Sequence, residues 1–263
     1  LRKFVEQNPL STLSEIKKYL KDHHELDVCI QTVSNYLKQE NLTLKLTRDL
    51  ITGRNSGSTK ERQFSYISNI LKGEVDMNKC IFIDEAGLNQ SMRRSYGRSA
   101  KGDRCYRKCH LIRGQNISLC MAISKEGIVH HKIRSGSFNR IYFQEFMVEL
   151  EALLGDDEFW LVVDNCRIHY EIYLDYPEHR MLFLPPYSPM LNPIEAVFSK
   201  LKRKVQVQTL KNSVEMCSSY PVQFRRMANC IEDCIQDMRS TNLTRYYEHV
   251  SSHFDSCINK INV

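Results

Sequence analysis

The spacing of apolar and polar residues predicts a small helical unit followed by a larger α/β unit. Within residues 1–50, apolar positions recur at the helical period over 12–21 and again over 30–39. The second predicted helix leaves polar side chains on its outer face, and they include Gln31, Thr32, Asn35 and Lys38. A short second helix of this kind is typical of helix-turn-helix DNA-binding domains, although any small helical bundle also fits the pattern.

Changes in composition divide the chain further. Residues 51–62 (ITGRNSGSTKER) hold two glycines and, after Ile51, no large apolar side chain, which is typical of a linker. We therefore expect a linker over 51–75 between a helix-turn-helix domain at 1–50 and an α/β domain at 76–210. From residue 211 to residue 263 the helical pattern continues, which predicts a C-terminal helical extension.

Short apolar runs within 76–210 predict a central sheet flanked by helices. The runs that end at Asp84 and Asp164 are apolar at every position, as in strands buried on both faces. The other predicted elements are a hairpin over 117–133, a strand over 181–184, and helices over 137–154 and 192–205. The expected fold class is therefore α/β, with a mixed sheet.

Both buried strands run directly into an aspartate. If the strands are neighbours, Asp84 and Asp164 lie a few ångströms apart, where two carboxylates repel each other unless a cation lies between them. Oxygen ligands alone favour hard ions such as Mg²⁺ or Mn²⁺. Each aspartate taken separately is better explained by the turn that follows a strand, and it is the third acid that favours a functional site.

A third acid, Glu195, follows a proline-rich segment. It lies at the border of the apolar stripe of the predicted helix 192–205, where a side chain can reach along the edge of the sheet. A local explanation competes with this one. Asn192 as N-cap, Pro193 at the first helical position and Glu195 three residues after the cap also form a plausible capping box.

Basic residues gather close to the candidate acids. The net charge is +6. The segment from 93 to 113 contains eight basic residues and a single acidic residue, Asp103. They are Arg93, Arg94, Arg98, Lys101, Arg104, Arg107, Lys108 and Arg113. A second cluster on the predicted helix 192–205 includes Lys202. Such clusters neutralise DNA phosphates, and their position beside the acids favours this interpretation over a merely solvated face.

The ten cysteines do not have the paired spacing of zinc sites, and several lie in apolar runs. Reduced, structural thiols and an intracellular location are therefore expected. No stretch is long and apolar enough for a transmembrane helix, and no secretory signal is visible. Because the chain begins at Leu1 and not at Met, a fragment or a processed gene model is expected.

Four segments resemble the catalytic core of mariner-type transposases and their bacterial insertion-sequence relatives, which are DDE enzymes with an RNase H-like fold. They are FIDEAG (82–87), YGRSAKGDR (96–104), VVDNCRIH (162–169) and LPPYSPMLNPIEAVFSKLKRK (184–204). The resemblance covers roughly residues 76–205. It departs from the family in the short spacing between Asp164 and Glu195, which are separated by 30 residues.

The resemblance implies a DNA transposase that cleaves transposon ends and transfers the strand into target DNA. Asp84, Asp164 and Glu195 would hold two Mg²⁺ ions, which Mn²⁺ can replace, with Asp84 shared by both. The implied partners are double-stranded DNA, with terminal inverted repeats and target sites, and a second copy of the chain in a homodimer. The expected location is the nucleus in a eukaryote and otherwise the cytoplasm.

Two further residues have possible auxiliary roles. Asn165 is a candidate for holding its loop by hydrogen bonding, and His169 for orienting a phosphate or a water. Strand alternation points Glu85 away from Asp84, so Glu85 is left out of the ligand set. Two alternatives stay open, namely a hydrolytic RNase H-like nuclease and a transposon-derived DNA-binding protein without catalysis.

Overall fold

A computed structural model shows two compact units, Leu1–Leu50 and Ile51–Val263. The structure describes residues 1–47, 52–88, 98–106, 116–155, 157–175, 180–211, 220–239 and 241–261. The boundary between the units coincides with the predicted end of the N-terminal domain. None of the helices in the described ranges is long and apolar enough to cross a membrane.

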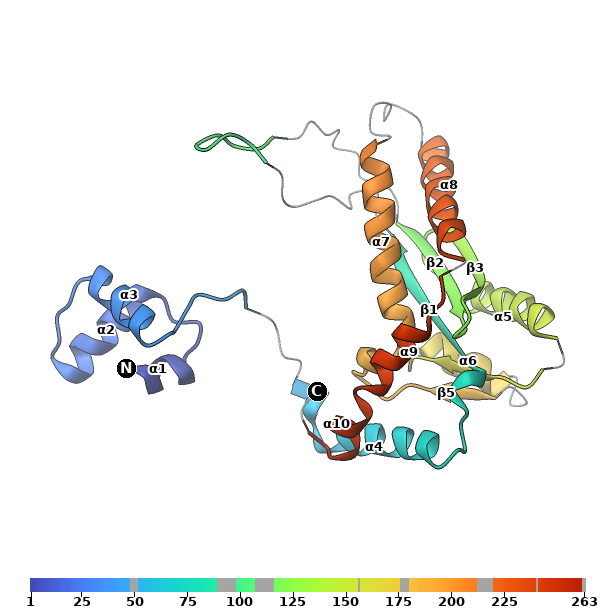
Figure 1. The fold of residues 1–263 in the computed structure, drawn as a ribbon, viewed down its shortest axis with the longest axis horizontal. Coiled ribbons are helices and arrows are strands. Elements are labelled where there is room, and N and C mark those ends of the chain that lie inside the picture. Colours follow the sequence, from blue (N-terminus) through green and yellow to red (C-terminus); the bar gives the residue numbers. More distant parts are fainter. Residues whose placement is uncertain are drawn as a thin grey trace. The chain divides into compact units, whose positions relative to one another are not determined.

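The N-terminal unit consists of three helices, α1 (Arg2–Gln7), α2 (Leu13–His24) and α3 (Ile30–Gln39) (Figure 1). Helix α2 begins with a capping box, because Thr12 accepts from the backbone N–H of Glu15 and the Glu15 carboxylate accepts from that of Thr12 at 2.7 Å. Ile16, Leu20 and Val33 form the buried core between α2 and α3.

The larger unit is built on a five-stranded mixed sheet with strand order β3-β2-β1-β4-β5 (Figure 1). The strands are β1 (Cys80–Leu88), β2 (Ile117–Ile123), β3 (Ile128–Ser135), β4 (Trp160–Val163) and β5 (Met181–Phe183). Strands β1, β2 and β3 pair antiparallel, whereas β4 pairs parallel with both β1 and β5. The predicted mixed sheet and hairpin are confirmed.

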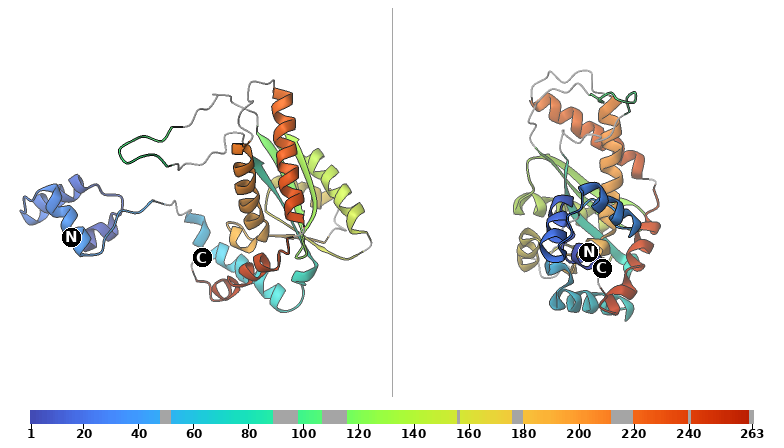
Figure 2. Two further views of the ribbon diagram at one scale, coloured as in Figure 1. Left: turned by 45° about the horizontal axis from the view of Figure 1, so that its top comes forward. Right: turned by 90° about the vertical axis from the view of Figure 1, so that its left-hand side faces the viewer.

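Helices cover both faces of the sheet (Figure 2). One face carries α5 (Arg140–Leu154) and α6 (Arg167–Asp175), and the other carries α7 (Pro193–Lys211), α8 (Tyr220–Arg239) and α9 (Thr244–Ser251). Strand alternation sends Ile81 and Ile83 of β1 into the cluster with α5, and Phe82 and Ala86 into the cluster with α7. Because Asp84 lies between Phe82 and Ala86 in this alternation, its side chain is on the face of the sheet that α7 covers.

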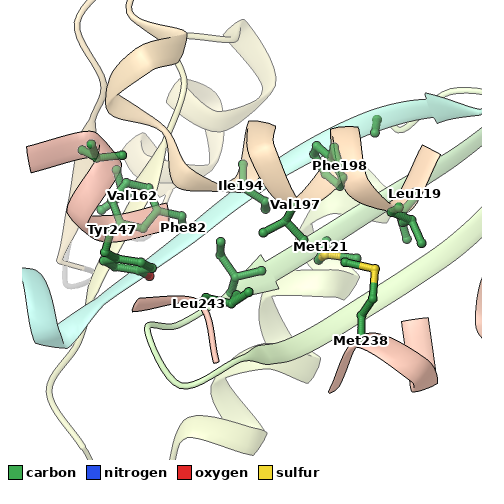
Figure 3. Packing of buried hydrophobic residues seen from close by; sticks show 14 of the residues in the cluster. Phe82, Leu119, Met121, Val162, Ile194, Val197, Phe198, Met238, Leu243 and Tyr247 are labelled. Carbon is green, nitrogen blue, oxygen red and sulfur yellow. The ribbon is translucent and has the colours of Figure 1, made fainter. Parts of the chain in front are cut away.

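Helices α8, α9 and α10 (Phe254–Ile258) belong to the larger unit. The separate C-terminal extension that the sequence predicts over 211–263 is therefore corrected. Figure 3 shows Tyr247 against Phe82, and Leu243 and Met238 near Met121, within one buried cluster. The Tyr247 hydroxyl also donates to the backbone carbonyl of Cys80 at 3.3 Å. These helices are amphipathic, and their apolar faces complete the core over the sheet.

The linker predicted over 51–75 is also corrected, because most of it is helical. A short 3-10 turn (Thr52–Asn55) leads into α4 (Gly57–Leu71), for which Ser56 is the N-cap. Tyr66 and Ile67 of α4 are buried, and the helix packs against α10 (Phe254–Ile258). The polar first turn hides this helix in the sequence, since its apolar residues come only in the second half.

Candidate active site

The two aspartates lie side by side on neighbouring strands. In the parallel pairing of β1 with β4, Phe82 is opposite Val162, and the same register continued by two residues brings Asp84 level with Asp164. Neighbouring strands lie about 4.8 Å apart, and residues level with each other share a face. One expectation is corrected, because β1 does not end at Asp84 but continues to Leu88, paired with β2. Asp84 therefore lies inside a strand, next to the point where β4 ends.

Asn192 joins the start of α7 to Asp84. Its side-chain amide donates to Oδ2 of Asp84 at 3.0 Å, and its Oδ1 accepts from the backbone N–H of Ile194 at 3.3 Å. Asn192 is therefore both a helix cap and a partner of the buried carboxylate. Its own backbone N–H donates to Pro189 at 3.1 Å, so this group is not the partner of the Glu195 carboxylate that a capping box requires.

Glu195 lies in the first turn of α7, and its side chain is exposed. Burial raises the pKa of Asp84 to about 7, with smaller contributions from the charges of Asp164, Glu85 and Glu195 and an opposing hydrogen bond from the Glu85 N–H at 2.8 Å. Both other members of the predicted triad are thus close enough to Asp84 to act on its charge. The contact of Asn192 with Asp84 brings the start of α7, which carries Glu195, beside the strand that carries Asp84.

The donor set of these three acids is suited to a hard divalent cation. It consists of carboxylates whose mutual repulsion and burial a cation would relieve. In the described part of the chain, no three His, Cys, Asp or Glu side chains form a cluster compact enough to hold a metal ion. The acids therefore face a common region without converging on one point.

His169 of α6 is completely buried and lies between two carboxylates. Its Nδ1 is 2.8 Å from Oδ1 of Asp164, and its Nε2 is 3.1 Å from Oε1 of Glu85. Burial alone lowers the pKa of His169, but the hydrogen bonds to Asp164 and Glu85 outweigh it and raise this pKa to about 10. The hydrogen bond from His169 in turn lowers the pKa of Asp164. A fully buried ring cannot orient a phosphate or a bulk water, so that predicted role is wrong.

The remaining predicted site residues are distributed over several elements. The Asn165 side chain donates to the backbone carbonyl of Leu184, which ties the end of β4 to the segment after β5. On α3, Gln31, Thr32, Asn35 and Lys38 are all exposed, and Gln31 donates to Asn35 at 2.9 Å.

Of the basic residues, Arg98, Lys101 and Arg104 are exposed in the segment 98–106, which contains a turn closed by the Asp103 N–H on the carbonyl of Ala100 at 3.0 Å. Lys202 is half-buried on α7. The others lie outside the described residues: Arg93, Arg94, Arg107, Lys108 and Arg113.

Sequence reasoning missed the roles of Asn192 and Glu85. Asn192 was interpreted only as a helix cap, which it is, and nothing local pointed to Asp84 as its second partner. Strand alternation points Glu85 away from Asp84, and the structure confirms this orientation, since the Glu85 carboxylate contacts His169 in the layer of α5 and α6. The only indication in the sequence that Asn192 and Glu85 belong to the site is that each lies within a few residues of a candidate acid.

A mixed sheet that carries acidic side chains on two adjacent strands and an adjoining helix has the kind of carboxylate arrangement on which two-metal nucleases depend. The sequence profile of the DDE superfamily endonucleases matches residues 79–217, more than half of the chain. The chain belongs to this family. No curated protein sequence matches it significantly.

Solved structures with the same fold are complexes and domains of the Mos1 transposase. The paired-end complex with the left transposon end has a TM-score of 0.74 at 15% identity, covering 99% of this chain and 77% of that one. The paired-end complex with Mn has a TM-score of 0.73 at 15% identity, covering 100% and 78%. The isolated catalytic domain has a TM-score of 0.54 at 12% identity, covering 82% and 97%. At these identities the likeness concerns the fold.

Proposed function

We propose that this chain is a DNA transposase that cuts the ends of its element and joins them to target DNA. The observation that carries the proposal is the register of β1 and β4, which brings Asp84 level with Asp164, together with the position of Glu195 in the first turn of α7. Membership of the DDE endonucleases supports the cutting reaction. The fold shared with Mos1 in its strand transfer complex, with a TM-score of 0.72 at 15% identity, supports the joining reaction.

Asp84, Asp164 and Glu195 would hold two Mg²⁺ ions, for which Mn²⁺ can substitute. Ions bound there would supply Lewis-acid chemistry, which would lower the pKa of an attacking water or DNA 3′-hydroxyl and stabilise the leaving oxygen. The protein holds the acids in place. Asp84 is fixed by a buried strand, with the Glu85 N–H on Oδ1 and the Asn192 amide on Oδ2. Water and a 3′-hydroxyl are interchangeable nucleophiles, so one site serves both steps.

The N-terminal unit is proposed to bind the terminal repeats as a helix-turn-helix domain. Helix α3 is its second long helix, and the polar residues on its exposed face suit the major groove. The exposed basic residues of segment 98–106 are proposed to contact DNA phosphates. A homodimer, which would bring two ends together, and a nuclear location in a eukaryotic host complete the proposal.

The decisive experiment measures cleavage and strand transfer on DNA that carries the element's own ends, with Mg²⁺ or with excess chelator. Wild type is compared with Asp164→Asn and Glu195→Gln, and Asp233→Asn, an exposed acid on α8, is the matched control. We expect chelator-sensitive cleavage and joining in wild type and control, and loss of both in the two active-site variants.

Three results would contradict the proposal. Cleavage that persists in Asp164→Asn or in chelator would exclude the mechanism. Cleavage by wild type without joined product would favour a hydrolytic nuclease. Binding to the ends without any cleavage would favour a transposon-derived DNA-binding protein.

A further inference from the structure

His169 connects the two faces of the sheet at the end of β4. Strand alternation points Glu85 into the layer of α5 and α6, whereas Asp84 takes the face covered by α7. The His169 ring lies in the first of these layers, fully buried, with its centroid 4.3 Å from that of Phe143. It is therefore held by packing and has no contact with solvent.

Both ring nitrogens of His169 have a carboxylate partner. Nδ1 lies 2.8 Å from Oδ1 of Asp164 and 3.3 Å from the backbone carbonyl oxygen of the same residue, so both Asp164 atoms share this donor. Nε2 lies 3.1 Å from Oε1 of Glu85. A rotation of the ring would break both contacts at once, and the packing against Phe143 opposes it further. Because Glu85 belongs to the central strand β1, the bridge fixes Oδ1 of Asp164 relative to the strand that carries Asp84.

Asp164 needs such support more than Asp84 does. It is the first residue after β4, and its side chain is 52% exposed, so packing alone does not select one rotamer. Its other hydrogen bond comes from the Cys166 N–H at 3.0 Å, also to Oδ1. The two contacts together hold one oxygen of the carboxylate and leave Oδ2 for a cation.

We propose that His169 is a positioning residue, which holds Asp164 in the orientation that binds a divalent cation, with Glu85 as the anchor of the ring. Groups that hydrogen-bond to metal ligands in this way orient the ligands and strengthen the site. The inference rests on the proposed function, because it assumes that Asp164 is a metal ligand.

The test measures the Kd of Mn²⁺ for the full chain by electron paramagnetic resonance, at one pH and without DNA. Three substitutions separate the two sides of the ring. His169→Asn puts an amide nitrogen near the position of Nδ1, facing Asp164, whereas His169→Gln puts one near Nε2, facing Glu85, and His169→Ala removes both. Ile172→Ala removes a buried side chain from the same helix without touching Asp164 and is the matched control.

We expect His169→Ala and His169→Gln to weaken Mn²⁺ binding by about tenfold or more, within the range of about 10–100-fold known for such supporting residues. His169→Asn should stay closer to wild type, within about threefold, because it keeps the donor to Asp164. Trp160 fluorescence monitors folding in each variant, and if His169→Ala fails to fold, the comparison of Asn with Gln decides.

Several results would overturn the inference. Unchanged Mn²⁺ affinity in a folded His169→Ala or His169→Gln protein would show that Asp164 needs no such support. An equal loss in Ile172→Ala would show that His169 acts only through the stability of α6. Both results leave the proposed function intact, whereas failure of the wild type to bind Mn²⁺ would overturn both.

Discussion

Asp84 is a residue whose charge the surrounding fold opposes. It lies on a buried strand, and the charges of Asp164 and Glu195 add to the effect of burial. Each of its two oxygens accepts one hydrogen bond, from the Glu85 N–H or the Asn192 amide, and keeps a further lone pair for a cation. Without a cation, the folded protein therefore carries an unfavourable electrostatic energy at this position, as is common where function requires it.

Asp84→Asn is predicted to stabilise the protein in chelator by about 1–3 kcal/mol at pH 8. A pKa raised from 3.8 to about 7 corresponds to at most about 4 kcal/mol at 1.36 kcal/mol per unit. An asparagine has only one acceptor oxygen for the two donors, which removes about 1 kcal/mol of that gain. The measurement is urea unfolding followed by Trp160, the only tryptophan.

The same prediction has a defined pH dependence. Because the pKa of Asp84 is higher in the folded than in the unfolded state, the folded protein binds this proton more tightly. The penalty is therefore complete above about pH 7 and disappears as the pH falls towards 4, and the advantage of Asp84→Asn should disappear with it. Asp233→Asn, the exposed control, should show no such trend, and an Asp84→Asn protein no more stable than wild type at pH 8 would contradict the prediction.

Asn192 is predicted to contribute to stability and to catalysis through different atoms. Asn192→Ala loses the cap on Ile194 and the hydrogen bond to Asp84, which should destabilise the protein by about 1–3 kcal/mol. Asn192→Ser keeps a capping oxygen and should stay within about 1 kcal/mol of wild type. Neither variant can hold Oδ2 of Asp84, so both should cleave DNA roughly tenfold more slowly. Wild-type cleavage rates in Asn192→Ser would exclude the positioning role.

For single residues, what could be predicted from the sequence depends on how far apart in the sequence the contacting side chains are. Asp84 and Asp164 each follow an apolar run that identifies a buried strand, and the family resemblance added Glu195. The Asp84 carboxylate that Asn192 contacts is 108 residues away, and the Glu85 carboxylate that His169 contacts is 84 residues away. Such contacts depend on how the elements pack, and the local pattern assigns these residues only a cap and a polar position near a strand end.

Among the elements, those with a regular apolar pattern were predicted and those that depend on their neighbours were not. The hairpin β2–β3 and helix α7 follow directly from alternation and the helical period. Helix α4 begins with glycine, serine and charged residues, and only Tyr66 and Ile67 reveal its buried side. Helices α8 and α9 were identified as helical, but their place in the core follows only from the sheet against which they pack.

Helix α3 yields a prediction about DNA affinity. Asn35→Ala should weaken binding to the terminal sequence by about 1–3 kcal/mol while leaving binding to unrelated DNA nearly unchanged, because amides read base edges. Lys38→Ala should weaken both and reduce the slope of log affinity against log salt by about one, as expected for one lost phosphate contact. Fluorescence anisotropy over a salt series measures both effects.

Lys72→Ala is the control for helix α3, since Lys72 is an exposed lysine at the end of α4 in the other unit. It should leave affinity and salt slope as in wild type. If Asn35→Ala weakens binding to all sequences equally, α3 does not read bases and the helix-turn-helix interpretation is wrong.

The whole molecule has separate cores in its two units. The N-terminal unit is held by Ile16, Leu20 and Val33, and the larger unit by clusters on both faces of the sheet. A unit of about 50 residues has a total stability of roughly 2–7 kcal/mol at typical values per residue, and the larger unit has several times that reserve. Such a difference suits a division of labour in which a small unit recognises DNA and a rigid sheet holds the acids.

This division predicts two levels of hydrogen-exchange protection. Amides of α2 and α3 should open with free energies of at most roughly 2–7 kcal/mol. Amides of β1 and β2, most of whose residues are buried, should open with clearly higher ones. DNA carrying the terminal sequence, at about 100 times its Kd, should add up to about 2.7 kcal/mol to the protection of α3. Mass spectrometry of exchanged peptides resolves the two units. Equal protection in both units would show that the small unit does not open independently. If DNA protects β1 but not α3, the small unit does not form the primary contact with the transposon end.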